Sequence, residues 1–479
     1  MNYNLLLIKG KYSFMFRNRR SFLSLTLIII LLIASCRSYY KKNLKFNEYF
    51  RNAEFEKADQ ILEKDKKGPK RNTKLIYFLN RGVVAHALGK YSESNTYFEQ
   101  AYIFGEDYRK NIGSEALALV SNPMTSDYKG EDFELLTLHY FKALNFVFLN
   151  NYSDALVEAR RINVKLNALS DKYLKNIHYK NDAFAHYLMG ILFESSKEYN
   201  NAFTSYRNAY NCYKDDYSKL FGVAAPISLK KDLIRAAALT GFNDQVSLYE
   251  KEFGIKNETA QTNLNDVVFL WNNGLSPVKE EWSINFVLVK GADGMCTFVN
   301  EEYGMSFPFM ADSKEGNGGL GDLKMIRVAF PKYVERVPLY NSASVKVNNE
   351  TFEMEQVQNI NAIAFKSLED RMLREFSNAL LRLATKKAAE MALRNQNQDA
   401  GAALGILNAI TEKADTRNWQ TIPHSIYLTR LCLPEGKNTL SFVAKSSFTS
   451  TSKTYSMDVI VKPGKVNFFT FSTFDTKLK

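Results

Sequence analysis

The sequence predicts an α+β protein in which an N-terminal α-solenoid is followed by a β-rich, sandwich-like module with a helical insertion. Three observations predict this fold class. Across residues 37–256 apolar residues recur at helical spacing and proline is nearly absent. After residues 259–263 alternating and β-branched runs appear, as is typical of strands. From Phe365 toward Leu393 apolar residues again recur every three or four positions, which predicts a helix among the strands.

These patterns divide the chain into six segments. We expect a signal segment at 1–35, a tether and first helices at 36–75, a helical domain at 76–256, a first β-rich part at 257–354, the helical insertion at 355–413 and a second β-rich part at 414–479. Because stacked helix pairs contact mainly their neighbours, we expect the helical domain to fold without the β-rich parts.

The first segment has the order of a secretory signal. Arginines within residues 17–20 precede a short apolar run, 22–33, that is too brief for a membrane span of about 20 residues. The run Ile33-Ala34-Ser35-Cys36 resembles the lipobox of bacterial lipoproteins, which implies that Cys36 becomes the acylated N-terminus. The alternative is a short anchor helix with an incidental cysteine. Met15 opens a basic stretch typical of signals and is an alternative start.

Composition limits the classes of partner. Without residues 1–35 the chain has 58 basic and 51 acidic residues, a net charge of +7. A mild charge spread along the chain does not indicate nucleic-acid binding. The remaining cysteines, Cys212, Cys296 and Cys432, are scattered and lack CxxC spacing, so no disulfide framework is expected.

The helical domain contains an internal repeat of small and aromatic residues. Two copies are displaced by 108 positions, and a third lies between them. The packing positions are Gly82, Tyr91, Phe98 and Ala101 in the first copy, Tyr152 and Ala155 in the middle copy, and Gly190, Tyr199, Ala202, Tyr206 and Ala209 in the last. The pattern resembles the tetratricopeptide repeat, which implies antiparallel helix pairs stacked into a solenoid with a groove on its concave side. An irregular helical bundle is the alternative.

The C-terminal part predicts two consecutive hairpins. Residues 425–432 are expected to pair with 439–443 through a Pro/Gly turn, and 454–461 with 466–471 through another. Such hairpins would form the edge of a small β-sandwich. Pro338 confines its strand to a sheet edge.

No pattern in the chain predicts an enzyme or a cofactor. Gly316–Gly321 matches GxGxxG, but no strand precedes it and no helix follows it, so dinucleotide binding is rejected. His178, Asp182 and His186 share a helical face, but His186 occupies a repeat position that also accepts Phe, so a packing role is favoured over a metal site. The acidic run Glu131–Glu134 is interpreted as a helix cap, with Asp132 placing negative charge at the N-terminus.

Two motifs resemble an uncharacterised family of bacterial repeat-containing lipoproteins. These are GEDFE at 130–134 with ALVEARR at 155–161, and ADTRNW at 414–419 followed by LPEG at 433–436. Ile422-Pro423 stands where the family usually shows Leu-Pro. The resemblance implies an envelope protein without an established reaction, and the family's genes tend to lie near those of lipoprotein activators of cell-wall synthases.

Within the second motif, Asp415, Arg417 and Trp419 alternate along a segment expected to be extended. This spacing allows an Asp–Arg ion pair and stacking of the guanidinium on the indole. The three residues are interpreted as a structural patch that pins the helical insertion to the sheet, with a recognition patch as the alternative.

Together these observations predict a non-catalytic envelope lipoprotein, anchored through Cys36 in the outer membrane and facing the periplasm. Its expected partners are envelope proteins, in cell-wall or outer-membrane assembly, and it needs no nucleic acid, metal or small-molecule cofactor. A glycan-binding lipoprotein beside an outer-membrane transporter and a peptidoglycan hydrolase are the alternatives.

Overall fold

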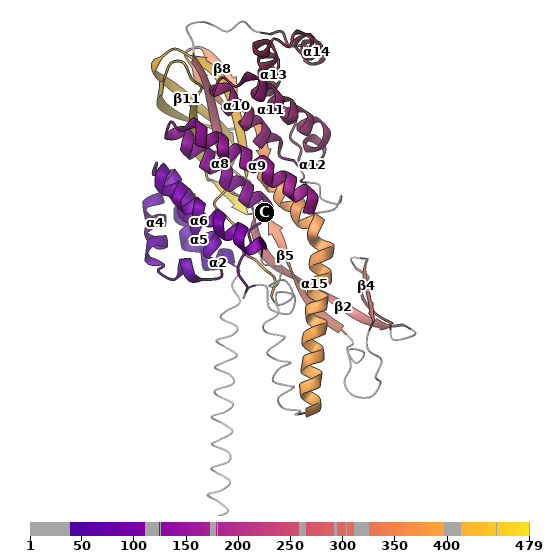
Figure 1. Ribbon diagram of the computed structural model, residues 1–479. Coiled ribbons are helices and arrows are strands. Elements are labelled where there is room, and N and C mark those ends of the chain that lie inside the picture. The colour runs from indigo at the N-terminus through magenta and orange to yellow at the C-terminus, as the bar shows by residue number, and fades with distance from the viewer. Residues whose placement is uncertain are drawn as a thin grey trace, which may run out of the picture.

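The computed structural model is a mixed α+β protein, with helices from the first half of the chain and sheets mostly from the second (Figure 1). The structure describes residues 39–110, 124, 126–172, 179, 181–257, 265–291, 295–302, 304–310, 325–396, 413–446 and 448–478. Cys36, His178, the glycine-rich run 316–321 and the second stretch of the helical insertion, 397–412, lie outside these residues.

The helical half consists mainly of paired helices, each pair packed on the next. Its elements are α2 (Tyr39–Lys42), α3 (Leu44–Arg51), α4 (Phe55–Lys64), η1 (Gly68–Lys70), α5 (Lys74–Ala87), α6 (Tyr91–Lys110), α8 (Asp132–Phe148), α9 (Tyr152–Lys172), α10 (Ala183–Ser195), α11 (Tyr199–Cys212), η3 (Tyr213–Tyr217), α12 (Ser218–Leu220), α13 (Ile227–Thr240) and α14 (Asn243–Phe253). The pairs are α5–α6, α8–α9, α10–α11 and α13–α14.

The repeat found in the sequence marks equivalent points of the first three pairs. Each second helix begins at the repeat's tyrosine: Tyr91, Tyr152 or Tyr199. Two residues before it stands a residue with left-handed backbone, Gly89, Asn150 or Lys197. The three turns therefore reverse the chain in the same way.

Of the expected packing positions, the small residues and the rings of Phe98 and Tyr206 lie where the paired helices cross, whereas the three tyrosines that begin the second helices are only partly buried. A Cβ on Gly82 would lie 2.5 Å from the Phe98 ring, and one on Gly190 would lie 2.3 Å from the Tyr206 ring. Each glycine thus lets an aromatic side chain of the second helix lie directly against the first. The small residues and rings at these positions are fully buried: Phe98, Ala101, Ala155, Ala202, Tyr206 and Ala209.

In the part of the chain that the structure describes, the strands form three four-stranded sheets and one pair. Their bounds are β1 (Asn265–Asn273), β2 (Val278–Lys290), β3 (Met295–Asn300), β4 (Met305–Met310), β5 (Met325–Val334), β6 (Arg336–Pro338), β7 (Tyr340–Val347), β8 (Glu350–Glu353), β9 (Glu355–Asn359), β10 (Ser425–Leu433), β11 (Gly436–Ser446), β12 (Ser452–Val461), β13 (Asn467–Thr473) and β14 (Thr476–Leu478). We call β13-β1-β10-β9 the inner sheet, β12-β11-β7-β8 the outer sheet and β4-β3-β2-β5 the arm sheet.

The prediction of two C-terminal hairpins is wrong. β10 pairs with β1 and β9, whereas β11 pairs with β12 and β7, so the turn at 433–436 carries the chain from one sheet to the other. β13 does not return along β12 but lies parallel to β1. Alternation of apolar residues says which face of a strand is buried and not which strand lies beside it. The edge position of Pro338 is confirmed, since β6 pairs only with β14.

The inner sheet lies between the helices and the outer sheet. Phe269 and Trp271 of β1 pack against the outer sheet at Phe442, forming the core of a two-sheet sandwich. The alternate residues Val268 and Leu270 belong to the core shared with the helices. The order of layers is therefore helices, inner sheet, outer sheet.

This arrangement buries the first helix of each of the first three pairs almost all round. Every residue of α8 from Phe133 to Asn145 is buried, and so is every residue of α10 from Ala183 to Glu194. In α5, residues 75–85 are buried except Tyr77. The second helices cover one side of these three helices. On the other side the inner sheet contacts α8 and α10, and Thr421 contacts Asn80 of α5.

A long helix and the arm sheet form an arm that extends away from these layers (Figure 1). Helix α15 (Ile360–Gln396) packs Phe376 and Leu380 onto Phe286 and Phe330 of the sheet. The insertion was expected from residue 355, but 355–359 is strand β9, and the helix begins where the Asn359 side chain accepts the Ala362 N–H. Within the part of the chain that is described, no helix has both the length and the hydropathy of a membrane crossing.

Candidate functional site

The two motifs of the family resemblance meet at the junction of helices and sheets. Glu131 is the N-cap of α8, and its backbone N–H donates to Glu134 Oε2 at 3.0 Å. Asp132, expected as the cap, is instead the first residue of the helix. From the second motif, the Trp419 N–H donates to Glu134 Oε1 at 2.6 Å. Motifs 285 positions apart thus share one contact.

Around this contact lies a buried group of charges that we call the Glu131 cluster: Tyr128, Glu131, Glu134, Lys279 and Arg371. Glu131 forms ion pairs with Lys279 of β2 and, at 2.5 Å, with Arg371 of α15. The Tyr128 hydroxyl donates to Glu134 Oε2 at 2.8 Å. The cluster therefore ties α8 to both the arm sheet and the arm helix.

The two carboxyl groups of the cluster have pKa values shifted in opposite directions. Burial raises the pKa of Glu131, but Arg371 and Lys279 outweigh it and bring that pKa to about 2. Burial and the nearby charge of Glu131 raise the pKa of Glu134 to about 7, against the lowering effect of the Trp419 N–H. One carboxyl is firmly ionised, and the other is close to its titration point at neutral pH.

Arg417 anchors the second motif to the helical half. Its Nε and Nη2 donate to the two carboxylate oxygens of Asp415, at 2.9 and 2.7 Å. Its Nη1 donates to the Asn72 and Ser126 carbonyls. The Asp–Arg pair that the spacing suggests is present, but the guanidinium lies over the Tyr128 ring and not over Trp419.

Trp419 is fully buried among residues of the helices. Its ring lies 6.0 Å from both Phe98 and Phe141, centroid to centroid. The next two residues also bind the helices: the Asn47 side-chain amide donates to Gln420 Oε1, and the Thr421 hydroxyl donates to Asn80 Oδ1. The segment contacts both halves: Arg417 and Trp419 bind the helical half, and Ala414 and Asn418 hydrogen-bond to Glu281 and Lys279 of β2.

A second buried group of charges, the Arg430 cluster, joins β10 to three helices. Arg430 Nη1 lies 2.9 Å from both Glu194 of α10 and Asp232 of α13, and Nη2 lies 3.3 Å from Asp266 of β1. Arg235 also pairs with Glu194, at 2.7 Å. Glu194 further accepts the hydroxyl of Tyr206, the ring that packs on Gly190. Burial raises the pKa of Glu194, but Arg430 and Arg235 hold it well below its usual range.

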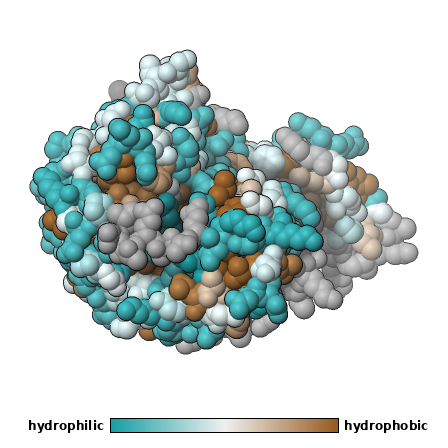
Figure 2. All heavy atoms as spheres, turned by 90° about the horizontal axis from the view of Figure 1, so that it is seen from above, coloured by the Kyte–Doolittle hydropathy of each residue, from teal (hydrophilic) through white to brown (hydrophobic). Residues whose placement is uncertain are grey.

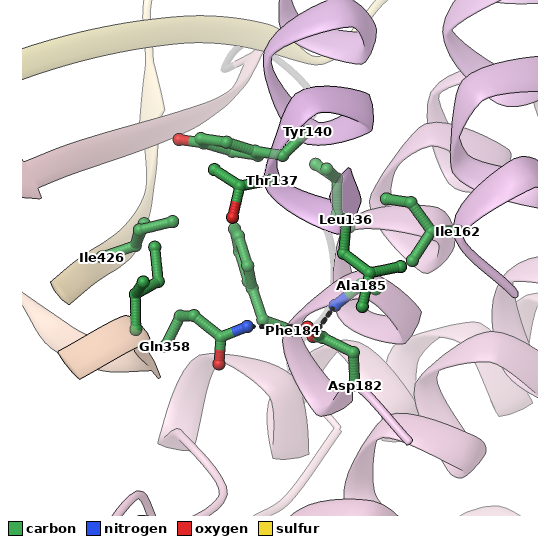
Figure 3. A pocket seen from close by; sticks show the side chains of 11 residues that line it. Leu136, Thr137, Tyr140, Ile162, Asp182, Phe184, Ala185, Gln358 and Ile426 are labelled. Atoms are coloured by element: carbon green, nitrogen blue, oxygen red, sulfur yellow. Dashed lines mark hydrogen bonds between the residues drawn. The ribbon is translucent and has the colours of Figure 1, made fainter. Parts of the chain in front are cut away.

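A small cavity lies between the two clusters' helices and the inner sheet (Figure 3). Asp182 lies at its edge as the N-cap of α10, where it accepts the Ala185 N–H at 2.7 Å and the Gln358 Nε2 at 2.8 Å. The cavity measures about 20 Å³, room for about one water molecule. It is too small for a substrate.

Of the three residues weighed as a metal site, His178 lies outside the described residues. Asp182 is engaged as a helix cap, and His186 is buried. Within the described residues no group of three or more His, Cys, Asp or Glu side chains is arranged to hold a metal.

Burial limits the chemistry that the carboxyl groups of the Glu131 cluster can perform. All four carboxylate oxygens of Glu131 and Glu134 accept hydrogen bonds or ion pairs from the protein, and these two residues line neither the small cavity nor the larger one described below. General acid–base chemistry needs a carboxyl group within reach of a substrate. The geometry is that of a joint between two halves of the molecule.

Sequence reasoning missed Lys279, Arg371 and Arg430, which complete both clusters. Each is a single basic residue in a strand or helix, and its spacing gives no signal of its burial. The acidic run 131–134 did give a signal, because a Glu three residues after an N-cap is the pattern of a capping box.

Comparison of the chain with models of known protein families and with curated proteins finds no match in either case.

Proposed function

We propose that the protein is a non-catalytic, lipid-anchored scaffold of the bacterial cell envelope that holds other envelope proteins on a stack of tetratricopeptide-like helix pairs. The repeated turns, the glycine–aromatic crossings and the order of pair on pair support such a stack. The signal segment and Cys36 support an acyl anchor in the outer membrane, facing the periplasm.

The inner side of the stack is occupied by the protein itself. The Tyr140 hydroxyl of α8 donates to Asn272 of β1, and Glu194 of α10 pairs with Arg430 of β10. A partner peptide therefore has no access to the face that solenoids commonly use, and partners must bind the outer side, formed by the second helices.

The observation that carries the proposal is a pair of exposed valines on one face of α9. Val157 is 41% exposed and Val164 is 67% exposed, and at seven residues apart they share one face of the helix, with Arg160 between them. Apolar side chains are exposed on the last pair as well, at Leu239, Phe242 and Leu248. Viewed from above, the surface at the α13–α14 end shows apolar residues emerging among hydrophilic ones (Figure 2).

Site-specific photo-crosslinking in cells that produce the full chain tests the proposal. A crosslinking residue in place of Val164 is expected to trap discrete envelope proteins. Ile460 on β12 is the matched control, because it is 66% exposed but lies on the outer sheet. Equal products at positions 164 and 460 would contradict the proposal.

The anchor is tested separately. Metabolic labelling with a palmitate analogue is expected to mark the wild-type chain and not Cys36→Ala. The Cys36→Ala change is also expected to reduce the products trapped at position 164, since it releases the stack from its partners' membrane. An unmodified Cys36 thiol found by mass spectrometry would refute the anchor.

The two other functions gain no support from the arrangement. A glycan-binding surface is expected to present exposed tryptophan or tyrosine rings in a groove, but Trp271 and Trp419 are fully buried and Trp282 is partly buried. A hydrolase is expected to present paired carboxyl groups in a cleft, and those of Glu131 and Glu134 are enclosed.

A further inference from the structure

A cavity of about 280 Å³ lies where the first helices meet the β6–β14 pair. Its walls are Tyr40, Leu44, Asn47, Glu48 and Arg51 from α2 and α3, and Arg336, Thr476 and Leu478 from the strands. The cavity is large enough for a group of several heavy atoms.

Arg336 is an unusual buried charge. It is only 4% exposed, and its Nε and Nη2 donate to the backbone carbonyls of Ser276 and Gln420. Within the described residues no carboxylate pairs with it, and its Nη1 makes no hydrogen bond. Burial lowers its pKa to about 9, which Tyr40 partly opposes and Arg51 reinforces. A buried guanidinium without a counter-ion favours an anionic ligand.

The rest of the cavity adds positive charge at its rim. Arg51 is exposed and forms no ion pair within the described part of the chain. Lys41, Lys42 and Lys45 are exposed on the same two helices. Glu48 is the one acidic residue in the cavity wall, also exposed.

We propose that this cavity binds a phosphate group, held by Arg336 in its floor and Arg51 at its rim. Guanidinium groups present donors that match the oxygens of phosphate, and two of them facing one cavity form a fork around it.

The position of the cavity suggests where the phosphate comes from, and this part rests on the proposed acyl anchor. Tyr40 follows Cys36 by four residues, so an extended chain places the cavity wall within about 14 Å of an acylated Cys36. Anionic headgroups of the same membrane would then lie beside the basic α2–α3 segment. A free phosphate compound of the periplasm is the other source.

Titration with inorganic phosphate, followed by calorimetry, tests the site without any membrane. A chain that begins at residue 37 keeps every described residue and lacks the acylated cysteine. Wild type is expected to bind phosphate, Arg51→Gln to bind about tenfold more weakly, and Glu48→Gln to bind about threefold more tightly.

Lys45→Gln is the matched control, because Lys45 lies on α3 outside the cavity wall. Its affinity is expected to stay within about twofold of wild type, as distant exposed charges are screened by salt. Arg336→Met is expected to abolish binding, but Arg51 and Glu48 are exposed and carry the test if Arg336→Met fails to fold. Absence of phosphate binding by wild type, or equal effects of Arg51→Gln and Lys45→Gln, would overturn the proposal.

Vesicles distinguish the two sources of phosphate. Binding to phosphatidylglycerol vesicles above phosphatidylcholine vesicles, weakened more by Arg51→Gln than by Lys45→Gln, assigns the site to lipid headgroups. Phosphate binding with no such difference assigns it to a free phosphate compound. Absence of phosphate binding by wild type, with crosslinking at position 164 intact, would refute this inference alone and leave the scaffold standing.

Discussion

The Glu131 cluster and the Arg430 cluster both join the helical half to the sheets, yet they balance charge differently. In the Arg430 cluster two arginines face three carboxylates, and every carboxylate has a cationic partner. In the Glu131 cluster both cations contact Glu131, while Glu134 is held by the Trp419 N–H, the Glu131 N–H and the Tyr128 hydroxyl. Ion pairs fix the joint at the Arg430 cluster, whereas the joint at the Glu131 cluster contains a carboxyl group that titrates.

Removing residues 257–479 breaks both joints together and is expected to have the largest effect. The chain would lose the inner sheet, which contacts α8 and α10, and Thr421, which contacts Asn80 of α5, and this would expose residues that are buried on these three helices. We expect the truncated protein to aggregate, contrary to the expectation from the repeat alone. A soluble monomer with the helical circular dichroism of the intact half would contradict this.

Arg430→Met breaks only the joint at the Arg430 cluster. It leaves Glu194, Asp232 and Asp266 with Arg235 as their remaining cation in that cluster, and unpairing a buried charge costs about 3–5 kcal/mol. Urea unfolding of the full chain measures the loss. Arg327→Met on β5, where the side chain is exposed, is the control and is expected to change stability by less than about 0.5 kcal/mol.

Replacing Gly190 or Gly82 by alanine tests the packing at the two helix crossings that lie next to the joints. A Cβ at Gly190 displaces Tyr206 from Glu194, whereas one at Gly82 displaces Phe98, which has no hydrogen bond to lose. Both changes overpack a core and cost about 1–3 kcal/mol, with Gly190→Ala the more costly. Gly105→Ala is the control, since its Cβ meets only the end of Leu135, at 3.2 Å. Equal stability of all three variants in urea would contradict the packing at the crossings.

Glu134→Gln tests the pH dependence of stability at the Glu131 cluster, and its expected effect on stability is the smallest. The folded pKa of Glu134, about 7, is above the unfolded value of 4.5, so its contribution to stability is complete below pH 4.5 and is lost as pH rises through 7. Glutamine at position 134 leaves the Glu131 N–H without its acceptor, which costs about 1–3 kcal/mol of stability. Because glutamine does not ionise, the variant lacks the loss of stability that wild type shows as pH rises through 7.

The variant is therefore expected to be closer to wild type in stability at pH 7.5 than at pH 5. Urea unfolding at both pH values measures the difference, with Glu353→Gln on exposed β8 as control. A gap that widens with pH would show that the pKa of Glu134 is not raised.

Much of the candidate site could be read from residues next to one another in the chain. The capping pattern at 131–134 and the Asp415–Arg417 pair are local, and both are present in the structure. The burial of Trp419 on Phe98, and the pairing of Glu131 with Lys279 and Arg371, depend on segments that no spacing connects. The helices could be predicted more fully than the site because each helix hydrogen-bonds within itself.

The sequence by itself determined the helix pairs, the small residues at their crossings and the change from helices to strands. These follow from periodicity and turn residues, which act within a few positions. Only the tertiary structure decided that β10 and β11 belong to different sheets, that β13 runs parallel to β1, and that one face of the inner sheet shares a core with the helices. An apolar face requires burial, but the hydrophobic effect has no direction, so the pattern does not name the surface that buries it.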